Sequence, residues 1–372
     1  SEFSSKPAVC PFFQRSGGVK LQPELLIGFM PIMSTEESLE RALEHVSQGW
    51  LPAQRSVLER IQHQLEAGDY NNDRPKLLRD LKEDFSLYLY CLKELSVMLN
   101  QHAQAPEQNW RLTENGAPPK QTPVEILHNS ELDAIRRVLG KSAADISQHV
   151  FDEMNDFQAL RLRESMLSAS TAEILAESVQ VDSEVAFSCG LLRQLGLALI
   201  SWNYPRVYAR AMETLTAETT LDALLKRALG FSPSLLGLAF ARRWNLSDDV
   251  LIALGDRKAQ IAARKPFGPE QEKDKLNNTP DSVGATLAKI CEVGEALARA
   301  NDPQHYPTAL ADWQTAQEVI ASHLGPRGIA AIYSRTQEYL REYSRRVPEV
   351  AEFVDAEAAR ETISGAHYSS KL

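Results

Sequence analysis

Apolar residues recur at intervals of three and four along most of this chain, with polar residues between them. The pattern is clear in residues 35–48, 53–67 and 75–100, where the first two segments carry apolar residues at Leu39, Ala42, Leu43 and Val46 and at Val57, Leu58, Ile61 and Leu65. This spacing puts the apolar side chains on one face of an α-helix. The alternation of period two that marks a strand is not sustained anywhere. The pattern therefore predicts an all-α protein.

One apolar stretch in the middle of the chain contains two strongly polar residues. The segment "GLLRQLG" at residues 190–196 is flanked by apolar residues on both sides, yet it holds Arg193 and Gln194. A buried charge without a partner costs several kcal/mol, so a guanidinium inside a buried helix should have an anionic partner.

Two stretches interrupt the helical pattern. Residues 103–123 hold four prolines and a glycine, and residues 265–282 are polar and rich in Pro and Asn, so both are expected to be loops. The chain end from about residue 356 is expected to be frayed. We therefore divide the chain into four parts: an extension with one helix (1–49), an N-terminal helical part (50–122), a central helical core (123–300) and C-terminal helices (301–372), the last including residues 309–323 and 327–346.

Charge and composition narrow the class of protein. The chain has 372 residues and a formal net charge of −10, which argues against nucleic acid as a partner because nucleic-acid binding needs clustered Lys and Arg. No apolar run approaches the roughly 18 residues needed to span a bilayer, and no basic-then-apolar leader is seen. We therefore expect a cytoplasmic protein without membrane contact. The four cysteines lack Cys-x-x-Cys spacing and are expected to act as small apolar residues.

Several motifs of the central part occur in a recognisable order. They are "PVEILHNSELDAIRRVLG" (123–140), "LRESMLSASTAEILAE" (162–177), the apolar helix with Arg193, "LGFSPSLLGLAFARRWNLSDDVLIAL" (229–254) and "LAKICEVGEALARA" (287–300). This order resembles the HD-related output domain (HDOD) family, a regulatory branch of the HD superfamily of metal-dependent phosphohydrolases. The resemblance extends over roughly residues 50–300, since "WLPAQRSVLERIQHQL" (50–65) is similar to the opening of an HDOD domain. It implies an HD-like bundle of helices with extra N- and C-terminal helices.

The resemblance also implies where a metal centre would lie. Catalytic HD proteins bind metal through a His, an adjacent His-Asp pair and a later Asp. At these positions this chain has Glu164, Arg193-Gln194 and Glu295. Arg is permanently protonated and has no lone pair to offer a metal. We therefore expect that the HD metal centre has been lost, and we expect no cofactor and no catalytic residues.

Arg193 has two interpretations. In the first, its guanidinium takes the place of the metal charge and lies between Glu164 and Glu295, with Gln194 completing the hydrogen bonds. In the second, Arg193 and Gln194 occupy the one solvated face of their helix. A side chain of Arg193 within about 3.5 Å of one of the two carboxylates would support the first interpretation.

Basic residues cluster just before the second loop. Arg257 and Lys258 belong to this cluster and are candidates for binding a small anion, although a solvated helix face is the favoured explanation. No Walker-type phosphate loop and no G-x-S-x-G motif is present in the sequence.

Three functions remain. The resemblance and the missing metal ligands favour a non-catalytic bacterial regulatory protein that acts by binding a partner protein or a small ligand. The alternatives are a divergent phosphohydrolase with Glu164, Glu295 and a displaced metal, and a nucleotide or anion receptor in which Arg193 or Arg257 reads phosphate in the old active-site pocket.

Overall fold

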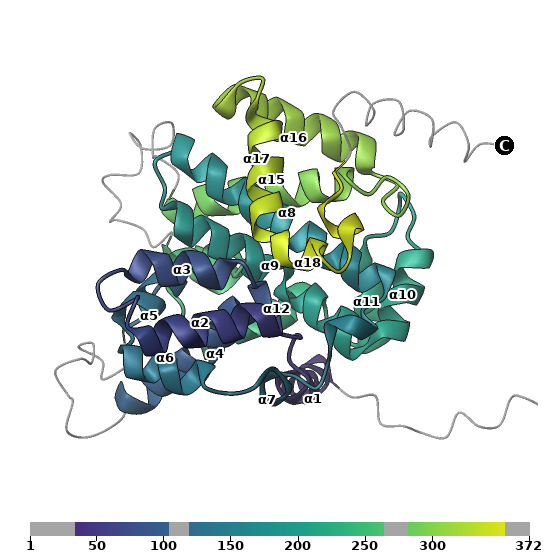
Figure 1. The fold of residues 1–372 in the computed structure, drawn as a ribbon. Coiled ribbons are helices and arrows are strands. Elements are labelled where there is room, and N and C mark those ends of the chain that lie inside the picture. The colour runs from purple at the N-terminus through teal and green to yellow at the C-terminus, as the bar shows by residue number, and fades with distance from the viewer. Residues whose placement is uncertain (1–33, 104–118, 264–281, 354–372) are drawn as a thin grey trace, which may run out of the picture.

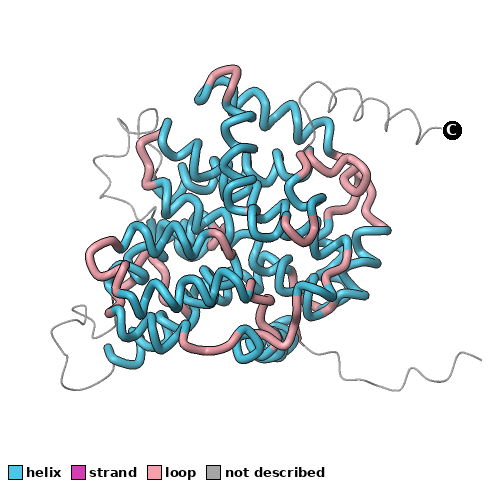
Figure 2. The backbone as a smooth tube through the Cα atoms, viewed as in Figure 1, coloured by secondary structure: helices cyan, strands magenta, loops and turns pink. Residues whose placement is uncertain are grey.

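A computed structural model describes residues 34–103, 119–263 and 282–353. These residues form helices joined by short loops and no strand, so the all-α prediction is confirmed (Figures 1 and 2). The helices of residues 55–139 lie together on one side of the molecule and the C-terminal helices from residue 309 lie on another, with the helices of residues 156–203 between them. The predicted loops at 103–123 and 265–282 and the chain end from 356 lie largely outside the described residues.

The first helices follow the predicted periodicity closely. Ser34 begins α1 with a capping box, in which its side chain accepts a hydrogen bond from Glu37 and the Glu37 side chain accepts one in return. Gly68 ends α2 in the left-handed conformation. The helices of this part are α1 (Thr35–Gln48), α2 (Arg55–Ala67), α3 (Arg74–Lys82) and α4 (Phe85–Ala103).

The helical periodicity of residues 75–100 corresponds to two helices, not to one. The helix breaks between Lys82 and Phe85, because the Asp84 carboxylate accepts hydrogen bonds from the backbone N–H groups of Ser86 and Leu87 and so begins α4. The motif at residues 123–140 likewise forms two helices, α5 (Pro123–Asn129) and α6 (Leu132–Leu139), because Ser130 and Glu131 adopt extended backbone conformations.

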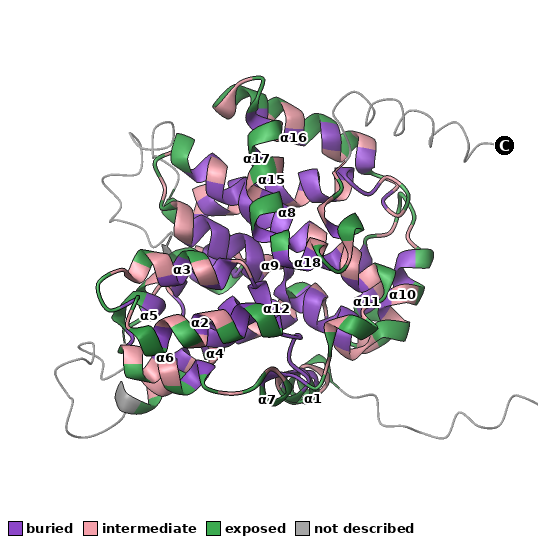
Figure 3. Ribbon diagram, viewed as in Figure 1, coloured by how far each residue is buried: buried purple, intermediate pink, exposed green. Residues whose placement is uncertain are grey.

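The centre of the molecule is built from three long helices that approach one another closely. They are α8 (Asp156–Ser178), α9 (Ser183–Asn203) and α15 (Val283–Ala300), and most of their residues are buried (Figure 3). Glycines permit the approach. A Cβ atom at Gly190 would lie 2.7 Å from Cα of Ala169, and one at Gly294 would lie 2.5 Å from the carbonyl oxygen of Ser168. The two outer helices α9 and α15 therefore pack almost backbone to backbone on α8.

The remaining helices surround this centre. Pro233 begins α12, and its carbonyl oxygen would lie 1.9 Å from a Cβ atom at Gly196 of α9. The expected C-terminal helix over 327–346 is divided near Leu340 into α17 and α18. These helices are α7 (Ala143–Ile146), α10 (Pro205–Glu213), α11 (Leu221–Leu229), α12 (Pro233–Arg243), α13 (Asp248–Ala253), α14 (Arg257–Ala263), α16 (Ala309–Leu324), α17 (Gly328–Tyr339) and α18 (Arg341–Ser344), with short 3-10 turns at Phe151–Glu153 and Pro348–Ala351.

Helix α9 also corrects an expectation about membranes. The sequence offers no uninterrupted apolar run, but α9 is long and apolar enough by length and mean hydropathy to cross a bilayer, and it is the one helix of the described residues with this property. Its most apolar window is 89% buried inside the protein, which accounts for its composition without a membrane.

Buried polar groups tie the N-terminal, central and C-terminal parts together. Lys82 of α3 is 1% exposed, and its Nζ lies 2.7 Å from Glu173 of α8 and also pairs with Glu184 of α9. Tyr339 of α17 donates to the same Glu173. Tyr343 of α18 donates to Asp84. Apolar residues from all parts, including Leu43 and Val46 of α1, form one continuous core.

We expect Gly196→Ala to lower the free energy of unfolding by about 3 kcal/mol, because the new methyl group would meet the Pro233 carbonyl and overpacking of this kind costs about 1–3 kcal/mol. Urea denaturation of the purified variant measures this change. Gly237→Ala is the matched control on the facing helix, where the nearest atom lies 3.1 Å away, and should cost clearly less. Equal losses in the two variants would contradict the close packing of α9 on α12.

Burial raises the pKa of Asp84 to about 6, against the hydrogen bonds of Gln54, Leu87, Tyr343 and Ser86, which lower it. The native state therefore binds this proton more tightly than the unfolded state, and the contribution of Asp84 to stability falls as pH rises from about 4 to about 6. We expect the free energy of unfolding of the wild type minus that of Asp84→Asn to decrease over this window and to be constant above it. Denaturation curves at pH 4.5 to 7.5 measure the difference, and a flat difference would exclude this titration.

Candidate functional site

Three central helices bring the predicted site residues to one region. Glu164 lies on α8, Arg193 and Gln194 on α9, and Glu295 on α15. Because glycines let these helices pack closely, side chains more than a hundred residues apart in the sequence come within hydrogen-bonding distance.

Arg193 forms a two-pronged ion pair with Glu295. Its Nε and Nη2 lie 2.7 and 2.9 Å from the two carboxylate oxygens, and its Nη1 donates to the carbonyl oxygen of Ala253 at 2.8 Å. Gln194 Nε2 donates to Glu295 at 3.3 Å. The two charged side chains are 17% and 20% exposed. Burial lowers the pKa of Arg193, but the hydrogen bond and charge of Glu295 outweigh it and raise the pKa. The guanidinium is therefore held charged and in one geometry.

The expectation that Arg193 also pairs with Glu164 was wrong. Glu164 is 1% exposed and pairs instead with Arg161, one turn earlier on α8, and accepts a hydrogen bond from Tyr306 at 3.2 Å. The spacing of three residues places Arg161 and Glu164 on the same face of the helix. Burial raises the pKa of Glu164, and the charge of Arg161 opposes that rise. Two separate ion pairs, rather than one shared guanidinium, thus occupy the two carboxylate positions.

These residues do not fit a divalent metal. Both oxygens of Glu295 accept hydrogen bonds from the Arg193 guanidinium, which would repel a dication. One oxygen of Glu164, Oε2, pairs with Arg161 and accepts a hydrogen bond from Tyr306, and the Arg161 charge would likewise oppose a dication. Within residues 34–103, 119–263 and 282–353, no group of three His, Cys, Asp or Glu side chains is arranged to hold a metal ion.

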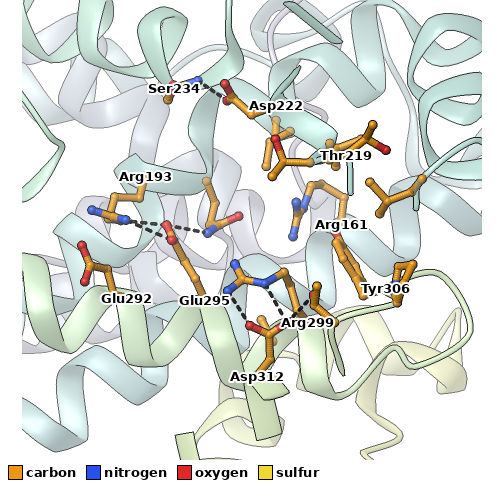
Figure 4. Close-up of a pocket in the computed structure, with 18 of the residues that line it drawn as sticks. Arg161, Arg193, Thr219, Asp222, Ser234, Glu292, Glu295, Arg299, Tyr306 and Asp312 are labelled. Carbon is orange, nitrogen blue, oxygen red and sulfur yellow. Dashed lines mark hydrogen bonds and ion pairs between the residues drawn. The ribbon is translucent and has the colours of Figure 1, made fainter. Parts of the chain in front are cut away.

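A cavity of about 840 Å³ opens beside these ion pairs. Arg161, Arg193, Gln194 and Glu295 contribute to its wall. Figure 4 shows Arg161, Arg193 and Glu295, with a further ion pair between Arg299 and Asp312. Arg299 Nη2 and Nε lie 2.8 and 3.2 Å from the two oxygens of Asp312. The cavity is thus lined by three arginines, each paired with a carboxylate.

Sequence reasoning missed several of these residues. Arg161 and Arg299 each stand one helical turn from a residue that was identified, Glu164 and Glu295 respectively. That spacing was the available signal. Asp312 gave none, because it reaches the cavity only through the fold of the segment after α15.

The predicted anion-binding residues Arg257 and Lys258 lie elsewhere. Both are exposed at the start of α14 and neither lines the cavity. The backbone N–H of Lys258 donates to Asp256, and the Asp256 carboxylate pairs with Arg242 at 2.8 Å. The hydrogen bond from Arg242 lowers the pKa of Asp256. The structure therefore does not bring Arg257 to the pocket in which it was expected to read phosphate.

Comparison with known proteins identifies the central region. Residues 132–258 match the family model of the HDOD domain, a narrower range than the motifs suggested. No curated protein matches the chain. One similar solved structure is the MmoQ response regulator from Methylococcus capsulatus strain Bath, 16% identical, with a TM-score of 0.48 over 76% of this chain and 97% of that one. Another carries the printed name "Putative phosphohydrolase", from Shewanella amazonensis SB2B, 14% identical, with a TM-score of 0.38 over 82% and 97%.

We expect Arg193→Met to lower the free energy of unfolding by about 3 kcal/mol, because it leaves the Glu295 carboxylate largely buried without its guanidinium. Adding Glu295→Met should restore most of the loss, since the pair is then removed together. Urea denaturation of both variants measures the effect. Arg55→Met, which breaks the exposed pair with Glu59, is the control and should cost less than about 1 kcal/mol. If Arg193→Met lowers the free energy of unfolding by less than about 1 kcal/mol as well, the Arg193 side chain is solvated.

Proposed function

Because residues 132–258 of this chain form an HDOD domain, we propose that the protein is a non-catalytic regulator in bacterial signal transduction. It acts by binding a partner protein or a small ligand, and it does so in the cytoplasm, without nucleic acid or membrane. The HDOD domain itself is a helical relative of the HD phosphohydrolases, so a signalling role and an enzymatic role share this fold.

The ion pair between Arg193 and Glu295 carries the proposal. In the HD pattern that the sequence resembles, these positions hold metal ligands. Here the guanidinium binds both oxygens of the carboxylate and a backbone carbonyl, so all three of its nitrogens are used. A cation built into the fold supplies the charge that a metal would supply, but it cannot activate water.

The alternative of a divergent phosphohydrolase finds less support in the geometry. It needs Glu164 and Glu295 as ligands of one displaced metal. Each carboxylate is instead paired with a different arginine, and Glu164 is 1% exposed. A metal would have to displace two buried ion pairs before it could bind.

We expect the intact protein to retain far less than one equivalent of transition metal after incubation with Mn²⁺ or Fe²⁺ and dialysis, because Glu164 and Glu295 are each paired with an arginine whose charge opposes a dication. Elemental analysis by mass spectrometry measures the metal. In parallel, the metal-treated protein should not hydrolyse bis(p-nitrophenyl) phosphate above the rate of buffer. Glu295→Gln serves as the matched variant. One equivalent of metal in the wild type that is lost in Glu295→Gln, together with hydrolysis, would overturn the non-catalytic assignment.

A further inference from the structure

The cavity beside the ion pairs has the chemistry of a binding site for a small organic phosphate. We propose that it binds a sugar phosphate or nucleotide, with the phosphate between Arg161 and Arg299 and the hydroxyl groups facing Asp222 and Thr219. This inference rests on the proposed regulatory function, for which it names the ligand class.

Arg161 is the first half of the phosphate site. Its side chain is 4% exposed, lines the cavity and pairs with Glu164 through Nη2. Its Nε is buried and has no hydrogen-bond partner among the described residues. A buried N–H donor without an acceptor is unfavourable, and a ligand oxygen that shifts into this corner of the cavity supplies the acceptor.

Arg299 is the second half and approaches from another wall (Figure 4). Its bonds to Asp312 use Nε and Nη2. Within the described part of the chain, this pairing leaves the Nη1 end of the guanidinium for a ligand. Two guanidinium groups from different helices suit a phosphate, whose several oxygens can accept from both at once, better than a planar carboxylate.

The opposite side of the cavity carries hydrogen-bond acceptors. Asp222 and Thr219 lie there, away from Arg299 and Asp312 (Figure 4). The Asp222 carboxylate accepts one backbone hydrogen bond, from Ser234 at 3.3 Å, and is half-buried. A carboxylate in this position matches ligand hydroxyl groups, as in the recognition of ribose by an acidic residue.

The charge balance of the lining excludes a bare anion as the best ligand. The lining residues include three arginines and four acidic residues, Asp222, Glu292, Glu295 and Asp312, which is a formal charge of −1. A ligand therefore has to offer hydrogen-bond donors as well as an anionic group. The cavity volume of about 840 Å³ lies within the range of small-molecule sites, and leucines from α9, α11 and α12 provide apolar wall for the body of the ligand.

Helix α15 and the segment after it complete this site from outside the matched residues 132–258. Tyr306 and Asp312 line the cavity, and Tyr306 donates to Glu164. This segment leads into α16 and then α17, which is tied to α8 through Tyr339 and Glu173. A phosphate bound to Arg299 therefore contacts the residue that pairs with Asp312, and Asp312 lies in the first turn of α16.

Isothermal titration calorimetry with the full chain tests the proposal. The probes are ribose 5-phosphate, AMP and GMP, with inorganic phosphate and adenosine as compounds that lack one half of the chemistry. We expect at least one of the three organic phosphates to bind at least tenfold more tightly than inorganic phosphate and at least tenfold more tightly than adenosine. Tighter binding of the nucleotides than of ribose 5-phosphate would indicate that the leucines contact the base. Equal binding would indicate that the ligand is a sugar phosphate. Absence of binding at millimolar concentration overturns the proposal.

Variants locate the site. Arg299→Gln and Asp222→Asn should each weaken binding at least tenfold. Asp222→Asn should do so with a thermal midpoint close to that of the wild type, because an amide oxygen can still accept the backbone hydrogen bond from Ser234. Arg242→Gln is the matched control, because Arg242 forms a similar ion pair with Asp256 but does not line the cavity. Wild-type affinity in the first two variants, or equal weakening in the control, overturns the assignment. If the protein binds neither an organic phosphate nor a metal, the proposed ligand is wrong but the proposed non-catalytic role stands. If it binds metal and hydrolyses the phosphodiester, the non-catalytic role itself is wrong.

Discussion

A guanidinium inside a bundle of apolar helices has to be neutralised, and in this protein Glu295 does so for Arg193. The pair joins α9 to α15 in a geometry that uses both carboxylate oxygens, while the third nitrogen is bound by the carbonyl of Ala253. Breaking it would leave a charge in a poorly solvated place. The ion pair therefore joins two of the three central helices and fixes the guanidinium beside the cavity.

The same solution is repeated around the cavity. Arg161 is neutralised by Glu164 and Arg299 by Asp312, so the wall is rich in charge but close to balance. Such a wall has N–H donors left over without a strongly positive field. That is the physical reason for inferring a ligand with both an anionic group and hydroxyl groups, rather than a simple anion.

Buried polar contacts also explain why parts that are distant in sequence form one body. Lys82, Glu173 and Tyr339 connect α3, α8 and α17, and Asp84 connects the start of α4 to Tyr343. Each of these groups is satisfied only when the other parts are in place. The position of the C-terminal helices is thus coupled to the core that carries the cavity.

The sequence alone determined the helical class, most helix positions and which residue types stand at Glu164, Arg193, Gln194 and Glu295, because periodicity and the chemistry of single side chains are local properties. It also indicated that Arg193 needs a carboxylate partner. It did not decide which carboxylate, nor the helix breaks at Asp84 and Ser130. Tertiary structure made those choices: glycine contacts set how closely α8, α9 and α15 pack, and that packing brought Arg193 to Glu295 and Arg161 to Glu164. Asp312 joins the site only because the chain returns over the cavity after α15, and no local pattern records that return.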